Sequence, residues 1–295
     1  MNIDDTYIED TFAEAFGMRY VRLIITAADD YWLDAALREL TGYSSSVIAC
    51  DAEAGLERRL EATETPDGRP GASVLLFGFS TDALNKSVPN RVGQCVMTCP
   101  TTAVFDGLPA AETRIPLGKK IRFFGDGFQK SKQVAGRRYW RIPVMDGEFL
   151  VDDLVGADKG VAGGNVIIQS VDQATGLAAV RRATAAIWRT AGVITPFPGG
   201  SARSGSKVGS RYKGLVASTS DPYCPTLRGR VESKLHKDAN CAYEIVIDGT
   251  SEQAVGAAMA AGLRSAAGNG IVAITAGNYG GKLGKFHFHL RKLLS

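Results

Sequence analysis

Hydrophobic and polar positions in the N-terminal half of the chain follow two periods that alternate along the sequence. Short apolar runs with a period of about two residues predict strands. These strands are expected at residues 20–26, 46–50, 73–79 and 102–105. Apolar residues spaced three or four positions apart predict helices at residues 30–40 and 81–97. The elements therefore follow the order β-α-β-β-α-β.

The C-terminal half repeats this order of elements. Strands are predicted at residues 165–170, 193–196, 243–247 and 271–276, and helices at 173–190 and 252–267. Asp172 stands at one helix start and Thr250 or Ser251 at the other, where short polar side chains accept hydrogen bonds from free N–H groups. Gly192 and Gly268 follow the two helices, as expected for residues that end them.

Two copies of this unit predict an α+β fold of two ferredoxin-like α/β-sandwich lobes from an internal duplication. We expect an N-terminal lobe at residues 1–118 and a C-terminal lobe, which carries the main site loops, at residues 163–295. Between them, residues 119–162 alternate in polarity at 121–127 and 139–144, which predicts bridging hairpin strands. Because helices cover only one face of each sheet, the other face needs a partner, and we expect an oligomer.

Composition limits the classes of function. The chain has 295 residues and a formal net charge of +3 without a long basic run, which does not favour nucleic acid as a partner. No apolar run approaches the roughly 20 residues of a membrane helix, and the acidic N-terminus lacks the apolar core of a signal peptide. Five scattered cysteines and three histidines show neither disulfide-framework nor zinc spacing. We therefore expect a cytoplasmic protein with reduced thiols and no metal site.

Two loops in the C-terminal half have the composition of a ligand site. Residues 195–209 contain glycines, serines and two cations, and residues 218–226 form a second polar loop. Glycine lets the backbone approach a ligand closely, and consecutive N–H groups can converge on an anion. These loops are therefore candidates for holding a substrate.

Two glycine-rich stretches have spacings like those of phosphate-binding P-loops. In residues 200–206, Ser206 stands where that motif has lysine, and in residues 280–285, Leu283 stands where it has serine or threonine. Nucleotide hydrolysis is therefore not expected at either stretch.

Glu244 is the sharpest catalytic candidate, because it follows the two loops and lies on the predicted strand at 243–247. On a pleated strand it shares a face with Val246 and Asp248. If this face is covered, Glu244 is a desolvated carboxylate suited to proton transfer near neutral pH. If it is open, Glu244 is an edge-strand carboxylate in water. The residues leave both interpretations of Glu244 open. Two other candidates have a structural alternative as well: Asn278 could be a turn residue, and Cys224 could be a packed thiol that contacts no ligand.

Motifs spread over nearly the whole chain closely resemble those of the formylmethanofuran:tetrahydromethanopterin formyltransferase family. They are Glu9–Phe16, Thr65–Gly71, Gly93–Thr98, Phe123–Gly127, Val161–Asn165, Pro196–Gly200, Ser206–Ser210, Asp221–Thr226, Tyr243–Ile247 and Ala276–Gly284. This resemblance implies reversible formyl transfer between two amine carriers, a methanofuran derivative and a tetrahydromethanopterin derivative, by direct attack in a ternary complex. It also implies a homotetramer, with no permanently bound cofactor.

If the source is bacterial, the resemblance further implies assembly with formyl-hydrolase subunits. The alternative function, from a different class, is that of a non-catalytic structural subunit of a formyltransferase/hydrolase complex. Intact site loops and the presence of Glu244 argue against that alternative.

The predicted chemistry requires stabilisation of a tetrahedral oxyanion and movement of a proton between two nitrogens. Glu244 is the expected acid/base. The amides of Gly199 and Gly200, with Ser206, Lys207 or Asn278, are expected hydrogen-bond donors. The family resemblance gives the substrate-binding set as Gln94, Asp126, Pro198, Gly199, Gly200, Ser206, Lys207, Gly209, Ser210, Asp221, Tyr223, Cys224 and Asn278.

Overall fold

The computed structural model describes residues 1–295, which form two compact units of mixed α+β structure. Unit 1 consists of Met1–Gly17 and Val161–Ser295, and unit 2 of Met18–Gly160. The expected lobe boundaries at residues 118 and 162 stay a prediction. No helix has both the length and the apolar character that a membrane crossing requires.

Unit 2 is built on an antiparallel sheet with the order β4-β5-β3-β6. Its strands are β3 (Phe12–Thr26, of which Met18 onward is in this unit), β4 (Glu53–Leu60), β5 (Gly71–Gly78) and β6 (Ala103–Asp106). The helices α1 (Asp30–Thr41) and α2 (Thr81–Arg91) follow β3 and β5. Alternate residues of β3, including Val21, Leu23 and Ile25, are fully buried in a core shared with these helices. The two-residue period of β3 is thus explained by burial.

The remaining strands of unit 2 form a meander that extends this sheet. Strand β10 (Gly147–Asp152) runs parallel to β6 and antiparallel to β9 (Arg137–Val144), which pairs with β8 (Lys130–Val134). A short strand, β7 (Thr113–Pro116), pairs with the first residues of β11 (Leu154–Ser170). The hairpin strands expected around residues 139–144 are therefore present.

Three expected elements of unit 2 differ from the structure. Residues 46–50 are turns and bends rather than a strand, because the Ser46 carbonyl and hydroxyl accept bonds from the amides of residues 48–50. Residues 121–127 are not a hairpin strand: α3 (Gly118–Ile121) continues into the 3-10 turn Arg122–Gly125. The helix expected to reach residue 97 ends at Arg91 and is followed by the π-helical turn Val92–Val96.

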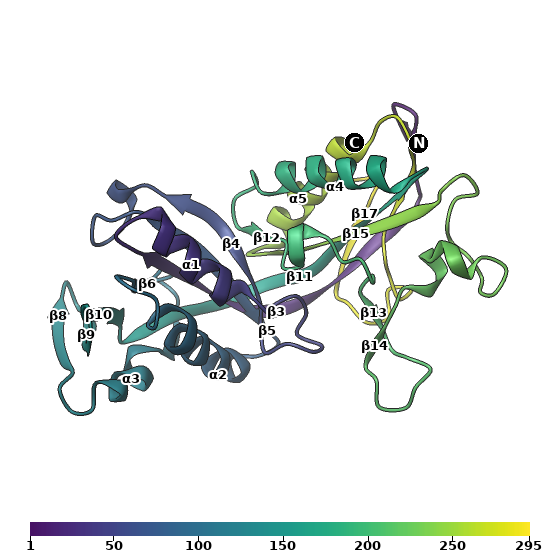
Figure 1. Ribbon diagram of the computed structural model, residues 1–295. Helices are drawn as coiled ribbons and strands as arrows, with labels where there is room; N and C mark the ends of the chain where they lie inside the picture. Colours follow the sequence, from purple (N-terminus) through teal and green to yellow (C-terminus); the bar gives the residue numbers. More distant parts are fainter. The chain divides into compact units, whose positions relative to one another are not determined.

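Unit 1 contains an antiparallel sheet with the corresponding order β12-β15-β11-β16. Here β12 is Val193–Ile194, β15 is Cys241–Gly249 and β16 is Ile271–Thr275. The helices α4 (Gln173–Ile187) and α5 (Glu252–Ala266) lie side by side and share a core with these strands (Figure 1). Asp172 and Ser251 cap the helices as predicted, each accepting a hydrogen bond from a backbone amide three residues ahead.

Strands from the two ends of the chain enlarge the sheet structure of unit 1. β2 (Thr6–Ile8) pairs with β1 (Asn2–Ile3) and lies parallel to β16, and β17 (Phe286–His289) pairs with the first residues of β3. Short 3-10 turns η1 (Ala62–Glu64) in unit 2 and η4 (Pro198–Gly200), η5 (Asp221–Tyr223) and η6 (Pro225–Leu227) in unit 1 complete the chain.

The connection from β12 to β15 carries both predicted site loops. Over residues 195–240 it contains only the 3-10 turns of unit 1 and a small two-stranded sheet of β13 (Lys207–Val208) and β14 (Ala217–Ser218). In Figure 1 these strands lie in the green segment of the chain. A long connection with little regular structure is typical of functional loops.

Candidate functional site

Glu244 lies within β15, between two other segments of unit 1. Its backbone pairs with Ile167 of β11 on one side. On the other side its carbonyl oxygen accepts hydrogen bonds from the Ala202 amide at 2.8 Å and the Ser201 hydroxyl at 3.0 Å. Glu244 is only 4% exposed. The interpretation of Glu244 as an edge-strand carboxylate in water is therefore wrong.

Ser206 supplies both hydrogen bonds to the Glu244 carboxyl group. Its backbone amide donates to Oε2 at 2.6 Å and its hydroxyl donates to Oε1 at 2.6 Å. Burial raises the pKa of Glu244, and the two Ser206 bonds only partly oppose this, while no charged neighbour contributes. A buried carboxyl group without a cationic partner binds a proton more readily than an exposed one, which suits acid/base chemistry.

The turn that brings Ser206 to Glu244 requires glycine at position 205. Gly205 has a φ of +71°, and a Cβ built there would lie 2.1 Å from Ser220 Oγ and 3.3 Å from Glu244 Oε2. Its amide donates to the Ala202 carbonyl at 3.1 Å and closes the turn. The backbone therefore approaches the carboxylate more closely than any side chain would allow.

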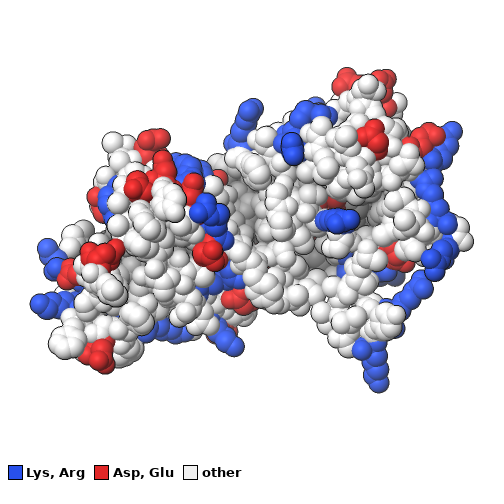
Figure 2. Space-filling view, in the orientation of Figure 1, with Lys and Arg blue, Asp and Glu red and all other residues white.

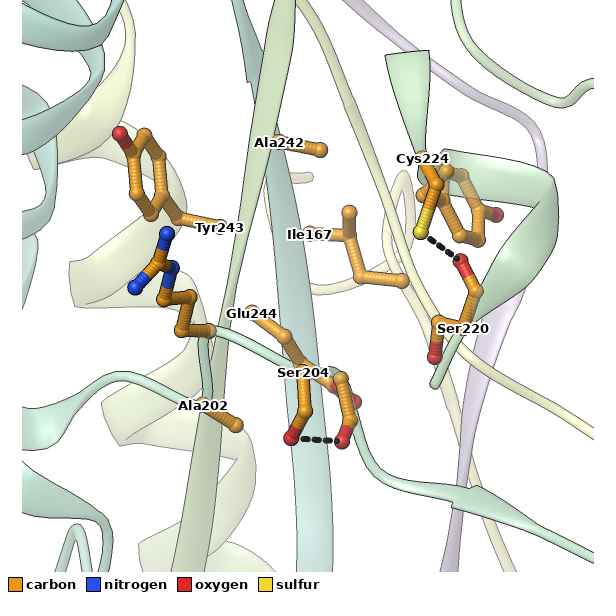
Figure 3. Close-up of a pocket in the computed structure, with 11 residues that line it drawn as sticks. Ile167, Ala202, Ser204, Ser220, Cys224, Ala242, Tyr243 and Glu244 are labelled. Atoms are coloured by element: carbon orange, nitrogen blue, oxygen red, sulfur yellow. Dashed lines mark hydrogen bonds between the residues drawn. The ribbon is translucent and has the colours of Figure 1, made fainter. Parts of the chain in front are cut away.

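A small pocket of about 40 Å³ opens beside this turn. Its lining includes Glu244, Gly205, Ser220, Tyr223 and Cys224. Figure 3 shows Ala242 and Tyr243 on opposite sides of β15, as strand alternation requires, and the Cys224 thiol directed at Ser220. The pocket thus joins the buried carboxyl group to the second predicted loop.

The second loop is tied to the first by charge. Lys207 Nζ contacts Asp221 Oδ1 at 2.5 Å, and Arg211, which is largely exposed, lies 3.9 Å from Asp221 Oδ2. The hydrogen bond from Lys207 is the main cause that lowers the pKa of Asp221. This pair links strand β13, which begins at Lys207, to the 3-10 turn η5, which begins at Asp221.

Tyr223 brings a second titratable group to the pocket. Burial raises the pKa of its phenol to about 12, against a hydrogen bond with Thr275 that lowers it. The phenol, which is neutral near pH 7 even with its ordinary pKa, therefore stays a hydrogen-bond donor at higher pH as well.

Two protein-family models match almost the entire chain. Formylmethanofuran-tetrahydromethanopterin formyltransferase matches residues 1–144, and the proximal lobe of the same family matches residues 147–293. The chain belongs to this formyltransferase family. Its family assignment agrees with the motif resemblance noted in the sequence.

Relatives of similar length are found in bacteria and archaea. The chain is 52% identical to the formylmethanofuran–tetrahydromethanopterin formyltransferase of Methylococcus capsulatus, over 100% of both chains. It is 47% identical to that of Methanosarcina mazei, over 99% of this chain and 100% of the relative. A component of the formyltransferase/hydrolase complex from Methylorubrum extorquens is 50% identical, over 97% of this chain and 95% of the relative.

Two solved structures have the same fold as this family member. The Methanosarcina barkeri formyltransferase superposes with a TM-score of 0.93 at 47% identity, covering 99% of this chain and 100% of that one. A chain of the Methylorubrum extorquens formyltransferase/hydrolase complex, crystallised with methylofuran, gives 0.96 at 48% identity, covering 100% and 99%.

Several of the residues predicted for a formyltransferase site lie together in unit 1. Glu244 contacts Ser206, Lys207 contacts Asp221, and Tyr223 and Cys224 line the pocket with Glu244. Gly209 and Ser210 continue from β13, where the Gly209 amide bonds to the Val216 carbonyl and Ser210 Oγ accepts from Tyr212 N. Pro198, Gly199 and Gly200 form η4, outside the pocket lining.

Most of the expected oxyanion donors already have partners within the chain. The Gly200 amide donates to Phe197 O at 2.8 Å, and the Ser206 donors are used by Glu244. Asn278 Nδ2 donates to Thr11 Oγ1 and Phe12 O. An oxyanion would therefore have to compete with an internal acceptor for each of these donors.

Gln94 and Asp126 belong to unit 2. Gln94 lies in the π-helical turn, and Asp126 follows the 3-10 turn at 122–125 with a positive φ of 50°. Both conformations are uncommon, and each stays a predicted substrate-binding position.

Sequence reasoning missed Gly205, Glu14 and Tyr279 as site residues. The Tyr279 hydroxyl accepts from Val208 N at 3.0 Å and donates to Ser206 O at 3.3 Å. Tyr279 thus contacts Ser206, the residue that donates both hydrogen bonds to the Glu244 carboxyl group. Glu14 and Tyr279 lie inside motifs that carried the family resemblance, which is the signal available in the sequence.

Glu244→Gln should change how stability depends on pH. Because the folded pKa of Glu244 is raised, the unfolded chain ionises first, so the wild type loses stability as pH rises from the ordinary value of 4.5 to the folded pKa. The variant has no such loss. The difference in free energy of unfolding, variant minus wild type, should grow with pH in denaturant titrations, and a difference that stays constant would contradict a raised pKa.

Gly205→Ala should lower the free energy of unfolding by about 1–3 kcal/mol and also reduce turnover. The added methyl group would displace Ser220 and press on the Glu244 carboxylate. Gly209→Ala is the matched control, since Gly209 has a φ of +88° but nothing within 4 Å of a built Cβ. Equal losses in the two variants, measured by chemical denaturation, would mean that the close approach at position 205 is unimportant.

Proposed function

We propose that this chain transfers a formyl group reversibly between formylmethanofuran, or a related furan carrier, and tetrahydromethanopterin, with Glu244 as the group that moves the proton. Membership of the formyltransferase family supports the reaction. The single observation that supports the residue is the burial of Glu244 beside a pocket in unit 1, with only Ser206 bonded to its carboxyl oxygens.

The proposed reaction needs one bond made and one broken. The acceptor amine attacks the formyl carbon of the donor, and a tetrahedral intermediate with a negatively charged oxygen forms. Glu244 takes the proton from the attacking nitrogen and returns it to the departing nitrogen as the carbon–nitrogen bond of the donor breaks. A pKa raised by burial suits both steps, because the carboxyl group must accept and release a proton within one turnover.

Tyr223 is the proposed donor to the oxyanion. Its phenol is protonated at neutral pH, as tyrosine ordinarily is, and burial, which raises the pKa of the phenol to about 12, extends the protonated form to higher pH; Tyr223 lines the same pocket as Glu244. A hydrogen-bond donor fixed beside the position of a developing oxyanion stabilises it. Ser206 and Lys207 would contribute only if their internal bonds to Glu244 and Asp221 rearrange.

The charge of the long connection supports an anionic carrier. Residues 203–240 contain eight Lys or Arg and three Asp or Glu. Figure 2 shows blue side chains along the outer edge of this part of unit 1. Of the cations near the site, Arg211 is 85% exposed, so it remains available for an acidic group on a substrate.

Further parts of the proposal concern architecture and assembly. The two units would be copies of one ferredoxin-like lobe, which the shared strand order supports. The chain would act in the cytoplasm, without a permanently bound cofactor, as a homotetramer. Its likeness to the Methylorubrum extorquens complex component supports an additional assembly with formyl-hydrolase subunits.

Glu244→Gln should reduce turnover at least about tenfold while the protein stays folded. The reason is that an amide of nearly the same shape can keep both Ser206 contacts but cannot carry the proton. Purified protein, formylmethanofuran and tetrahydromethanopterin are mixed, and formation of formyl-tetrahydromethanopterin is followed by absorbance.

Glu252→Gln is the control for this assay, because Glu252 is an exposed carboxylate in the first turn of α5 of the same unit. It should keep wild-type turnover. Wild-type rates in Glu244→Gln would remove Glu244 from the mechanism, and no transfer by the wild-type chain would favour the alternative of a non-catalytic structural role.

A further inference from the structure

Glu14 is a buried carboxylate held by four backbone amides of a single loop. It lies on β3 in unit 1 and is 2% exposed. Oε2 accepts from the amides of Tyr279 at 2.7 Å and Gly281 at 2.9 Å, and Oε1 from those of Leu283 and Gly284, both at 2.5 Å. Converging N–H groups of this kind form an anion-binding nest.

The loop around Glu14 is the second glycine-rich stretch whose spacing is like that of a P-loop. Gly280 and Gly281 have consecutive positive φ values of 69° and 74°; the Gly281 amide donates to Glu14, and the Gly280 amide donates to Asn278 Oδ1 at 3.1 Å. A Cβ at Gly284 would lie 2.4 Å from Ala15 O and 2.8 Å from Glu14 Cγ. The loop therefore has the form of an anion site, and the anion is a side chain of the same chain.

A continuous set of hydrogen bonds leads from this nest to the Glu244 carboxyl group. Tyr279 donates its amide to Glu14, while its hydroxyl accepts from Val208 N and donates to Ser206 O. Ser206 in turn donates both its amide and its hydroxyl to Glu244. Every member of this set belongs to unit 1.

We propose that Glu14 is a positioning residue for formyl transfer: by filling the nest of residues 279–284 it places the Tyr279 hydroxyl, which holds Ser206 against Glu244. This inference rests on the proposed role of Glu244. Glu14 itself touches no reacting atom.

Electrostatics favour the ionised form of Glu14. Burial opposes ionisation, but the four amides together lower the pKa of Glu14. The opposite holds at Glu244, whose pKa is raised by burial, with Tyr223 and Tyr279 as the titratable side chains that sense its charge. Loss of the Ser206 bonds would raise the pKa of Glu244 further, because those bonds favour its charged form.

The test is chemical rescue of Glu14→Ala with sodium acetate. The substitution removes a methylene and a carboxylate, so acetate has nearly the size and charge of the lost group. Without acetate, turnover should fall at least about tenfold, and the limb of the pH–rate profile that belongs to Glu244 should move to higher pH. Acetate at up to about 100 mM should restore turnover saturably, return the limb and raise Tm, whereas sodium chloride should not.

Two other variants separate positioning from general stability. Tyr279→Phe keeps the nest filled by Glu14 but removes the hydroxyl. The limb of its pH–rate profile that belongs to Glu244 should therefore also move to higher pH, and acetate should not reverse this shift. Asp172→Ala removes a carboxylate that accepts a backbone hydrogen bond in the same unit, from Thr175 N at 2.8 Å. It should keep wild-type turnover per folded molecule and show no response to acetate.

Wild-type turnover in Glu14→Ala, or a loss that acetate does not reverse, would overturn the inference. If Glu14→Ala does not fold, an unshifted pH profile in Tyr279→Phe would overturn it instead, and a displaced one would support it. The Glu244→Gln result identifies which proposal fails. A large loss there with no effect of Tyr279→Phe refutes only the role of Glu14, whereas wild-type rates in Glu244→Gln refute the proton-transfer role itself.

Discussion

The removal of the Glu244 carboxyl group from water is the physical constraint on which the site depends. A buried carboxylate without a cation is costly unless donors are placed close to it. Here both donors come from Ser206, a residue 38 positions earlier in the chain. The glycine at position 205 and the bridge from Ala202 to Glu244 bring that one residue within 2.6 Å of each carboxyl oxygen. The turn at residues 202–206 thus places Ser206 against the Glu244 carboxyl group.

The two units share one strand order but differ in the length of one connection between strands. This connection joins the second and third of the four strands in chain order, β4 to β5 in unit 2 and β12 to β15 in unit 1. In unit 2 it runs from Leu60 to Gly71, and in unit 1 from Ile194 to Cys241. The core elements of unit 1 therefore resemble those of unit 2, while the additional residues build the pocket. Long loops on a rigid scaffold commonly carry functional residues, and this connection contains both loops that the sequence marks as candidates for holding a substrate.

The regular elements were largely predictable because burial imposes a period on the sequence. Helix caps such as Asp172 and buried strands such as Ile245 to Ile247 follow from local rules. The second strand of unit 2 was predicted at residues 46–50 but lies at Glu53–Leu60 as β4. Consecutive exposed residues of β4, such as Arg58 and Arg59, interrupt the alternation of apolar and polar positions that marks a strand. In the structure the serines at 44–46 belong to a segment without strand, in which the side chain of Ser46 bonds to the backbone. The burial of Glu244 was one of two open interpretations, since coverage of a sheet face depends on distant residues. The partnership of Glu14 with residues 279–284 has no local signal at all.

The separation in sequence between Glu14 and its amide donors also concerns the order in which the protein is made. These contacts join residues that are 265 to 270 positions apart, so Glu14 is synthesised long before its donors and the contacts close a very long loop of chain. β17, which pairs with the same part of β3, is made later still. Until that loop of chain is closed, the Glu14 carboxylate has none of the amide donors that hold it in the folded protein. A fragment that stops before residue 279 lacks all four amides that bind Glu14, so the nest forms only when two very distant segments of the chain have come together.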